Sequence, residues 1–159
     1  MSYIRLANFF QVFEVSSTGS LLDKGRYNNG MPGKSITHNR ITYDYLSFIY
    51  QGAAKNRTGD NLEAQLVLAV NDISNGLGVQ AVRNKWQVRM FSAVMNNNGS
   101  VNRVLTEENW LAASMTYDNE TVEVILSSAI DAVGANAPTR VLTRDLVGHL
   151  PVTGNIQTL

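Results

Sequence analysis

The feature that most constrains the fold is a period of two in the placement of apolar residues. Residues 62–70 and 86–94 begin as alternating apolar and polar positions, and residues 39–51 and 121–127 follow the same period. Side chains on a strand point alternately to opposite faces, so this period predicts half-buried or buried β-strands. Shorter strands are predicted at residues 9–15, 101–105, 111–117 and 139–143. The chain is therefore expected to be mainly β.

A helix is expected at only one place, residues 72–83. The apolar spacing there permits a short helix that begins with Asp72 or Ser74 as its cap. Gly76 and Gly78 weaken this prediction, because glycine disfavours a helix interior and Asn75-Gly76 is a common turn sequence. Tight turns are also predicted around Asp118-Asn119 and at residues 96–99.

Residues 16–38 stand apart from these segments. They are rich in glycine, contain Pro32 and have little periodicity, so we expect an extended loop. A structureless loop of this length is unusual inside a compact domain, where most connections are about 4–6 residues long. A partner that orders it would explain its presence. With 159 residues, one domain is expected over residues 1–150, followed by a tail over residues 151–159.

Composition excludes several functions. Thirteen basic residues balance thirteen acidic ones, so no overall field attracts nucleic acid or anionic lipid. The absence of cysteine removes disulfides, thiolate metal sites and thiol catalysis. No apolar run approaches the roughly 20 residues that a membrane helix needs, and the N-terminal stretch lacks a secretory pattern. The protein is expected to be soluble when made, with no insertion into a membrane.

Motifs for chemistry are scarce, so we expect neither an enzyme nor a bound cofactor or metal. Residues that carry acid, base or ligand groups lie apart or in turn-like polar sequence: His38, His149, Glu107, Glu108, Asp118 and Glu120. Adjacent carboxylates on a strand point to opposite faces and do not form an acid pair. Residues 75–79 have the form of part of a phosphate loop but lack its lysine and third glycine. Trp86 and Trp110 are expected in the core or an interface.

Two segments carry a resemblance to a known family. LEAQLVLAVNDISNGLG, followed by VRNKWQVRMFSAVMN, resembles a strand, helical linker and barrel-crossing strand of the lambda-type minor tail protein L family of phage tail tips. VEVILSSAIDAVGANAPTRVLTRD resembles the end of the same domain. The similarity covers roughly residues 40–150. Members of that family carry a cysteine-rich region with an iron-sulfur cluster; because this chain lacks cysteine, a cluster-free version of the domain is expected.

The resemblance implies a fold and a role. The fold would be of the phage tail-tube and hub type, a β-barrel or sandwich with one helix. The role would be structural: a homo-oligomeric ring, hexameric or trimeric, at the distal tip or baseplate of a bacteriophage tail. Such a ring would join the tail tube and distal tail proteins to the central hub, after assembly in the host cytoplasm. DNA would meet it only by passing through the lumen.

Within this reading, residues 16–38 are expected to dock on a neighbouring subunit. Leu21, Leu22, Tyr27 and Met31 are the candidate apolar anchors. Deletion of residues 18–35 is expected to leave the domain folded and to abolish assembly. Residues 152–159 are a second candidate docking segment.

Two other function classes remain open. A carbohydrate- or receptor-binding β-module at the tail tip would use exposed aromatic residues, for which Tyr43, Tyr45 and Tyr50 are candidates. An enzyme, such as a peptidoglycan hydrolase carried by the tail, would need a positioned acid or metal site.

Overall fold

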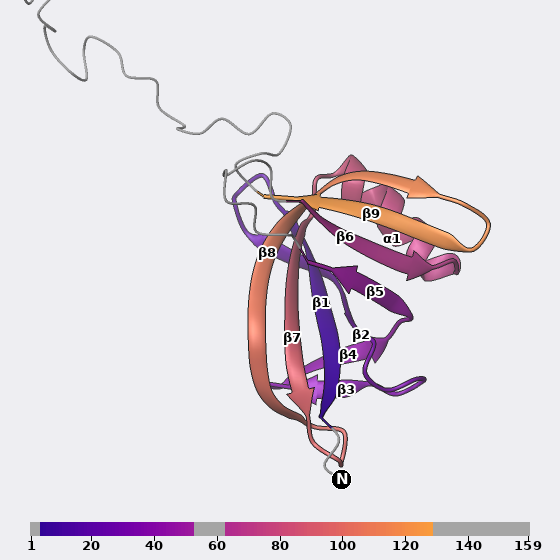
Figure 1. Ribbon diagram of the computed structural model, residues 1–159. Coiled ribbons are helices and arrows are strands. Elements are labelled where there is room, and N and C mark those ends of the chain that lie inside the picture. Colours follow the sequence, from indigo (N-terminus) through magenta and orange to yellow (C-terminus); the bar gives the residue numbers. More distant parts are fainter. Residues whose placement is uncertain (1–3, 53–62, 129–159) are drawn as a thin grey trace, which may run out of the picture.

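The longest strands of the protein lie side by side and organise the rest of the sheet (Figure 1). The computed structural model describes residues 4–52 and 63–128. Its elements, in chain order, are β1 (Arg5–Val15), β2 (Leu21–Asn28), β3 (Ile36–His38), β4 (Ile41–Tyr45), β5 (Phe48–Gln51), β6 (Glu63–Ala69), α1 (Asp72–Arg83), β7 (Gln87–Met95), β8 (Val101–Tyr117) and β9 (Thr121–Ser127).

The strands form one mixed sheet in the order β3-β4-β2-β1-β7-β8-β9-β6-β5. All neighbours pair antiparallel except β2 and β4, which run parallel. Short turns connect several neighbours, including Asn39-Arg40 between β3 and β4. Both of these residues have positive φ, as the right-handed twist of a two-residue hairpin requires. The predicted turns at residues 96–99 and at Asp118-Asn119 are confirmed.

The two ends of this strand order are brought together by the chain between β4 and β5. β4 pairs with β2 and β5 pairs with β6, yet only Leu46 and Ser47 separate the two strands. The Leu46 amide donates to the Asn28 carbonyl, and the Ala69 amide donates to the Ser47 carbonyl. Phe48 on β5 also meets Phe10 on β1 edge to face, with ring centroids 4.8 Å apart. The sheet is therefore strongly curled around a shared interior.

Two apolar clusters lie on opposite faces of this sheet. The larger cluster fills the interior and takes residues from the strands around it and from α1, including Phe10, Leu68, Met90 and Leu126. The smaller cluster lies on the outer face of β1 and β7, where Phe9 stacks on Phe91 and both are covered by the β3–β4 hairpin. Consecutive residues of β1 thus supply different cores, since Phe9 and Phe10 are both fully buried.

Helix α1 packs against β8 and β9 at one end of the curled sheet (Figure 1). Its cap is Asn71 rather than the expected Asp72 or Ser74. The Asn71 side chain accepts from the Ser74 amide, and the Ser74 hydroxyl accepts from the Asn71 amide, which completes a capping box. The predicted helix over residues 72–83 is confirmed, and Asn75-Gly76, a common turn sequence, lies within it.

Most strand predictions are confirmed, and three are corrected. Residues 39–51 form two strands because the chain changes pairing partner at Leu46-Ser47. Residues 101–117 form one long strand, β8, rather than two. The expected loop over residues 16–38 was wrong for two stretches: β2 pairs with β1 along its length, and β3 pairs with β4. Pairing within these two hairpins supplies the order that the period of apolar residues did not signal. The predicted strand at 139–143 and the tail at 151–159 lie outside the described residues.

Two glycines of α1 provide a matched stability test. A Cβ at Gly76 would meet nothing within 4 Å, whereas a Cβ at Gly78 would lie 3.0 Å from Cγ1 of Val122. Gly76→Ala is expected to raise the free energy of unfolding by about 0.5–1 kcal/mol, because alanine restricts the unfolded chain. Gly78→Ala is expected to gain less or to lose stability, since β9 must give way. Urea denaturation measures both, and equal gains would contradict this packing of α1.

Candidate functional site

The acid and base groups singled out from the sequence do not converge on one site. His38 contacts Phe91 with its ring, with centroids 5.8 Å apart. Glu107 and Glu108 point to opposite faces of β8, as expected for neighbours on a strand. His149 lies outside the described residues. In the part of the chain that the structure describes, no group of three or more His, Asp or Glu side chains is arranged to hold a metal ion.

Glu108 belongs to a hydrogen-bonded group that joins β5 to β8. The Tyr50 hydroxyl donates to the Glu108 carboxylate and accepts from Trp110 Nε1 at 3.1 Å. Burial, followed by the hydrogen bond to and the charge of Glu108, raises the pKa of Tyr50 far above its ordinary value. The phenol therefore stays protonated and links β5 to β8 across the interior. This arrangement is structural, because both hydrogen-bonding functions of the hydroxyl are occupied.

Asp118 also has a structural part. Its carboxylate accepts from the backbone amides of Glu120 and Thr121, at 2.8 and 2.7 Å, in the turn between β8 and β9. These backbone hydrogen bonds lower the pKa of Asp118. The side chain holds the hairpin turn and is not paired with a second carboxyl group.

The most unusual feature of the sheet is the presence of two long unpaired strand edges. β8 pairs with β9 only from Leu111 onward, so within the described residues no strand covers its second edge from Val101 to Trp110. β2 pairs with β4 only at Tyr27 and Asn28. Its edge over residues 21–26 is likewise uncovered by any described strand. Such edges expose main-chain donors and acceptors that pair readily with another chain.

The candidate docking residues divide into two pairs. Leu21 and Leu22 are about half exposed, at 49% and 47%, at the end of the β1–β2 hairpin, where Leu21 pairs with Val15. Tyr27 instead packs against Phe10, with ring centroids 5.1 Å apart. Met31 packs against the smaller cluster. The exposed apolar surface of this region is thus at Leu21 and Leu22.

The expected outcome of deleting residues 18–35 changes with this structure. The deletion removes β2 together with Asn28, which is fully buried. The Asn28 side chain donates to the Tyr43 carbonyl at 2.7 Å and accepts from the Gly30 amide at 3.1 Å. The deletion would therefore disrupt the fold itself, and point substitutions are needed to test docking.

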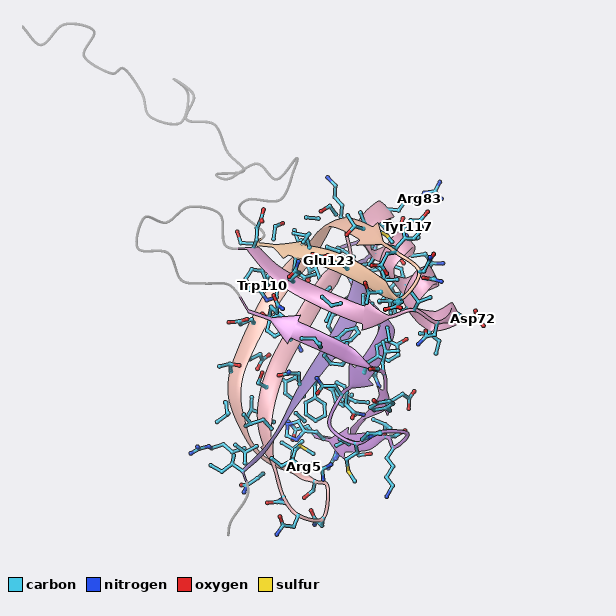
Figure 2. The ribbon with its side chains drawn as sticks, turned by 45° about the vertical axis from the view of Figure 1, so that its right-hand side comes forward. Arg5, Asp72, Arg83, Trp110, Tyr117 and Glu123 are labelled. Carbon is cyan, nitrogen blue, oxygen red and sulfur yellow. The ribbon has the colours of Figure 1, made fainter. Side chains whose placement is uncertain are left out.

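A second exposed apolar surface lies at the other end of the long strands. Ile4 and Leu6 at the start of β1 are exposed, and Val104 and Leu105 on β8 are partly exposed. The register of β1 with β7 places Arg5 beside Met95 and Phe13 beside Gln87. The β1–β2 hairpin tip is therefore far from this end, and Arg5 likewise lies away from Tyr117 and Arg83 in Figure 2. Two different surfaces are left without partners among the described residues.

The sequence contained a signal for the β8 edge. Residues 102–107 are exposed without alternation, and the corresponding sequence NRVLTE mixes charged, polar and apolar residues instead of following a period of two. A strand that fails to alternate buries neither face. The β2 edge had no comparable signal, because its strand pattern is interrupted by Lys24 and Gly25 at a bulge against β1.

Comparison with protein-family models found no match to this chain, and comparison with curated proteins also found none. Among the described residues, no helix has the length and apolar character required to cross a bilayer.

The hydrogen bonds of Tyr50 can be tested against a matched tyrosine. Tyr50→Phe removes the hydroxyl that satisfies Trp110 and Glu108, and is expected to lower the free energy of unfolding by about 1–3 kcal/mol. Tyr117→Phe alters a side chain that is 77% exposed, so its effect is expected within about 0.5 kcal/mol. Chemical denaturation measures the difference. Equal effects would show that the link between β5 and β8 adds no stability.

Proposed function

We propose that the protein is a structural ring subunit of a bacteriophage tail, located at the distal tip or baseplate, where it joins the tail tube to the central hub. Two lines of support carry this proposal. One is the resemblance of residues 40–150 to the lambda-type minor tail protein L family, which implies a tail-tube or hub type of fold. The other, which carries most weight, is the pair of edges on β2 and β8 that no described strand covers.

Strand direction is compatible with a continuous sheet between copies. β2, β1, β7 and β8 are neighbours and run antiparallel in succession, so β2 and β8 point in opposite directions. If neighbouring copies share one orientation, the β2 edge of one meets the β8 edge of the next as an antiparallel pair. This contact joins two different surfaces, and such head-to-tail contacts generate a ring when the rotation closes.

The two edges also differ in position. The uncovered part of β2 lies beside the second half of β1, whereas the uncovered part of β8 lies beside nearly all of β7, from Val88 to Met95. Pairing them shifts each copy along the strand direction, and this is the stagger that tilts strands in a closed sheet. Most charged side chains of the two edges already have partners within the chain: Lys24 pairs with Glu14, Arg26 with Asp23 and Glu107 with Arg89. The proposed contact therefore rests on main-chain pairing rather than on charge.

The exposed leucines add apolar contact to the main-chain pairing. Leu22 on β2 and Leu105 on β8 are exposed to a similar extent, 47% and 46%. Their burial in a ring would remove apolar surface from water on both sides of the contact. A ring of six or three copies fits this proposal, with DNA passing through its lumen and other tail proteins stacked on its two faces.

The alternative role, a carbohydrate- or receptor-binding module, rested on three tyrosines. Tyr43 is buried in the smaller cluster, and the Tyr50 hydroxyl is hydrogen-bonded to Glu108. Tyr45 is partly buried beside Asn28 on β2. These three side chains do not form one exposed aromatic platform, so the ring subunit is the function that we favour.

Point substitutions at the two edges test the ring. The unaltered chain is expected to have the mass of three or six copies by light scattering at high micromolar concentration. Leu22→Lys and Leu105→Lys are each expected to raise the dissociation constant of the oligomer at least about tenfold, because a lysine on an edge strand opposes pairing. Val79→Lys is the control, since Val79 is 51% exposed on α1, away from both edges.

Circular dichroism of each variant checks that the fold is retained. A monomer at every concentration of the unaltered chain would contradict the proposal. So would an oligomer that dissociates equally for Val79→Lys and for the two edge variants.

A further inference from the structure

A pocket of about 200 Å³ lies between the β3–β4 hairpin and the outer face of β1, β7 and β8. Its floor is formed by one residue of β1, two of β7 and two of β8: Gln11, Arg89, Phe91, Val104 and Glu107. Strand register places them together, since Gln11 pairs with Arg89, and Phe91 pairs with Glu107. His38 and Tyr43 of the hairpin form the wall. Neither the ring contact nor the family resemblance gives this pocket a purpose.

The floor contains hydrogen-bonding groups without protein partners. Gln11 is only 5% exposed, and its Nε2 donates to Asp23 at 2.9 Å, but no described residue donates to its Oε1. Arg89 uses Nε toward Asn109 at 3.4 Å and toward Glu107 at 3.6 Å. Its Nη groups donate to no described side chain or carbonyl. The side chains of Arg89 and Glu107 are 43% and 57% exposed, so their remaining donors and acceptors meet solvent at the pocket and are available to a polar ligand.

The wall contributes a further hydroxyl and an aromatic surface. The Tyr43 hydroxyl has no hydrogen-bond partner among the described residues, and burial raises the pKa of Tyr43, while Arg26 and Arg89 oppose this shift. The phenol therefore stays protonated and can both donate and accept. The His38 ring is tilted by 42° against Phe91 and is partly exposed, so it offers a ring face at the pocket.

The charge and the volume of the pocket limit the kind of ligand that it can bind. The guanidinium of Arg89 and the carboxylate of Glu107 compensate each other, which favours a neutral ligand over an ion of either sign. Donors and acceptors are both present, as suits hydroxyl groups that act in both ways. The volume is below the roughly 300–1,000 Å³ of pockets for drug-sized ligands, which leaves room for a single small ring.

We propose that this pocket binds one neutral sugar ring, with Arg89 donating to its hydroxyls, Gln11 and Glu107 accepting from them, and His38 packing against its apolar face. Strand pairing at the β8 edge uses main-chain groups in the plane of the sheet, whereas the pocket opens on its outer face. The site therefore does not depend on ring assembly. A monomeric chain that binds sugar would support the pocket and contradict the ring. A ring that binds no sugar would support the ring and contradict the pocket.

The test is titration of the full chain with methyl glycosides of glucose, galactose, mannose and N-acetylglucosamine, followed by ligand-observed NMR. At least one glycoside is expected to bind with a dissociation constant in the millimolar range. Arg89→Met keeps an unbranched side chain but removes the guanidinium, which also lies over the Phe13 ring at 5.3 Å, and Tyr43→Phe keeps the ring. Each is expected to weaken binding at least about tenfold, the equivalent of one lost hydrogen bond.

Matched controls are Arg103→Met and Tyr45→Phe, which alter the same residue types outside the pocket and are expected to bind as the unaltered chain does. Absence of binding for all four glycosides would overturn the proposal. Equal weakening by the controls would also overturn it. Binding of sialic acid alone would overturn the assignment to a neutral sugar.

Discussion

The pairing of β1 with β7 is the interaction on which the rest of the structure depends. β1 is buried on both faces: Phe10 faces the interior and Phe9 stacks on Phe91 on the outside, with ring centroids 4.6 Å apart and the planes nearly parallel. Each face then recruits a different layer, the curled sheet and α1 on one side and the β3–β4 hairpin on the other. Burial of two aromatic rings on adjacent residues removes enough apolar surface to hold both layers to one strand pair.

Strand length explains why no described strand covers parts of β2 and β8. β2 and β8 are longer than β4 and β9, which pair with their second edges, so each extends beyond that neighbour. Isolated proteins usually protect such edges with charge, bulges or covering segments. Here the edges carry charges of both signs and exposed leucines, a combination that suits a specific neighbour. The sugar pocket that we infer occupies a different part of the same strands, on the outer face rather than at the edge.

Several elements could be predicted from the sequence, and others could not. β6, β7 and β9 follow a period of two because each has a buried face along its whole length. β2 was missed because only its last residues reach the core, and its order comes from pairing with β1. The break at Leu46-Ser47 was missed because both halves alternate, one serving the outer cluster through Tyr43 and the other the interior through Phe48. The Asn71 cap was passed over in favour of its neighbours.

The sequence by itself determined that the chain is mainly β with one short helix, and that its acid, base and histidine residues are too scattered to predict a catalytic centre. Local patterns are sufficient for this, since strand period and residue type depend on neighbours along the chain. Only the tertiary structure decided the strand order, which parts of β2 and β8 no described strand covers, and that Gln11, His38, Arg89 and Glu107 border one pocket. These properties depend on contacts between residues far apart in the sequence, which no local period encodes.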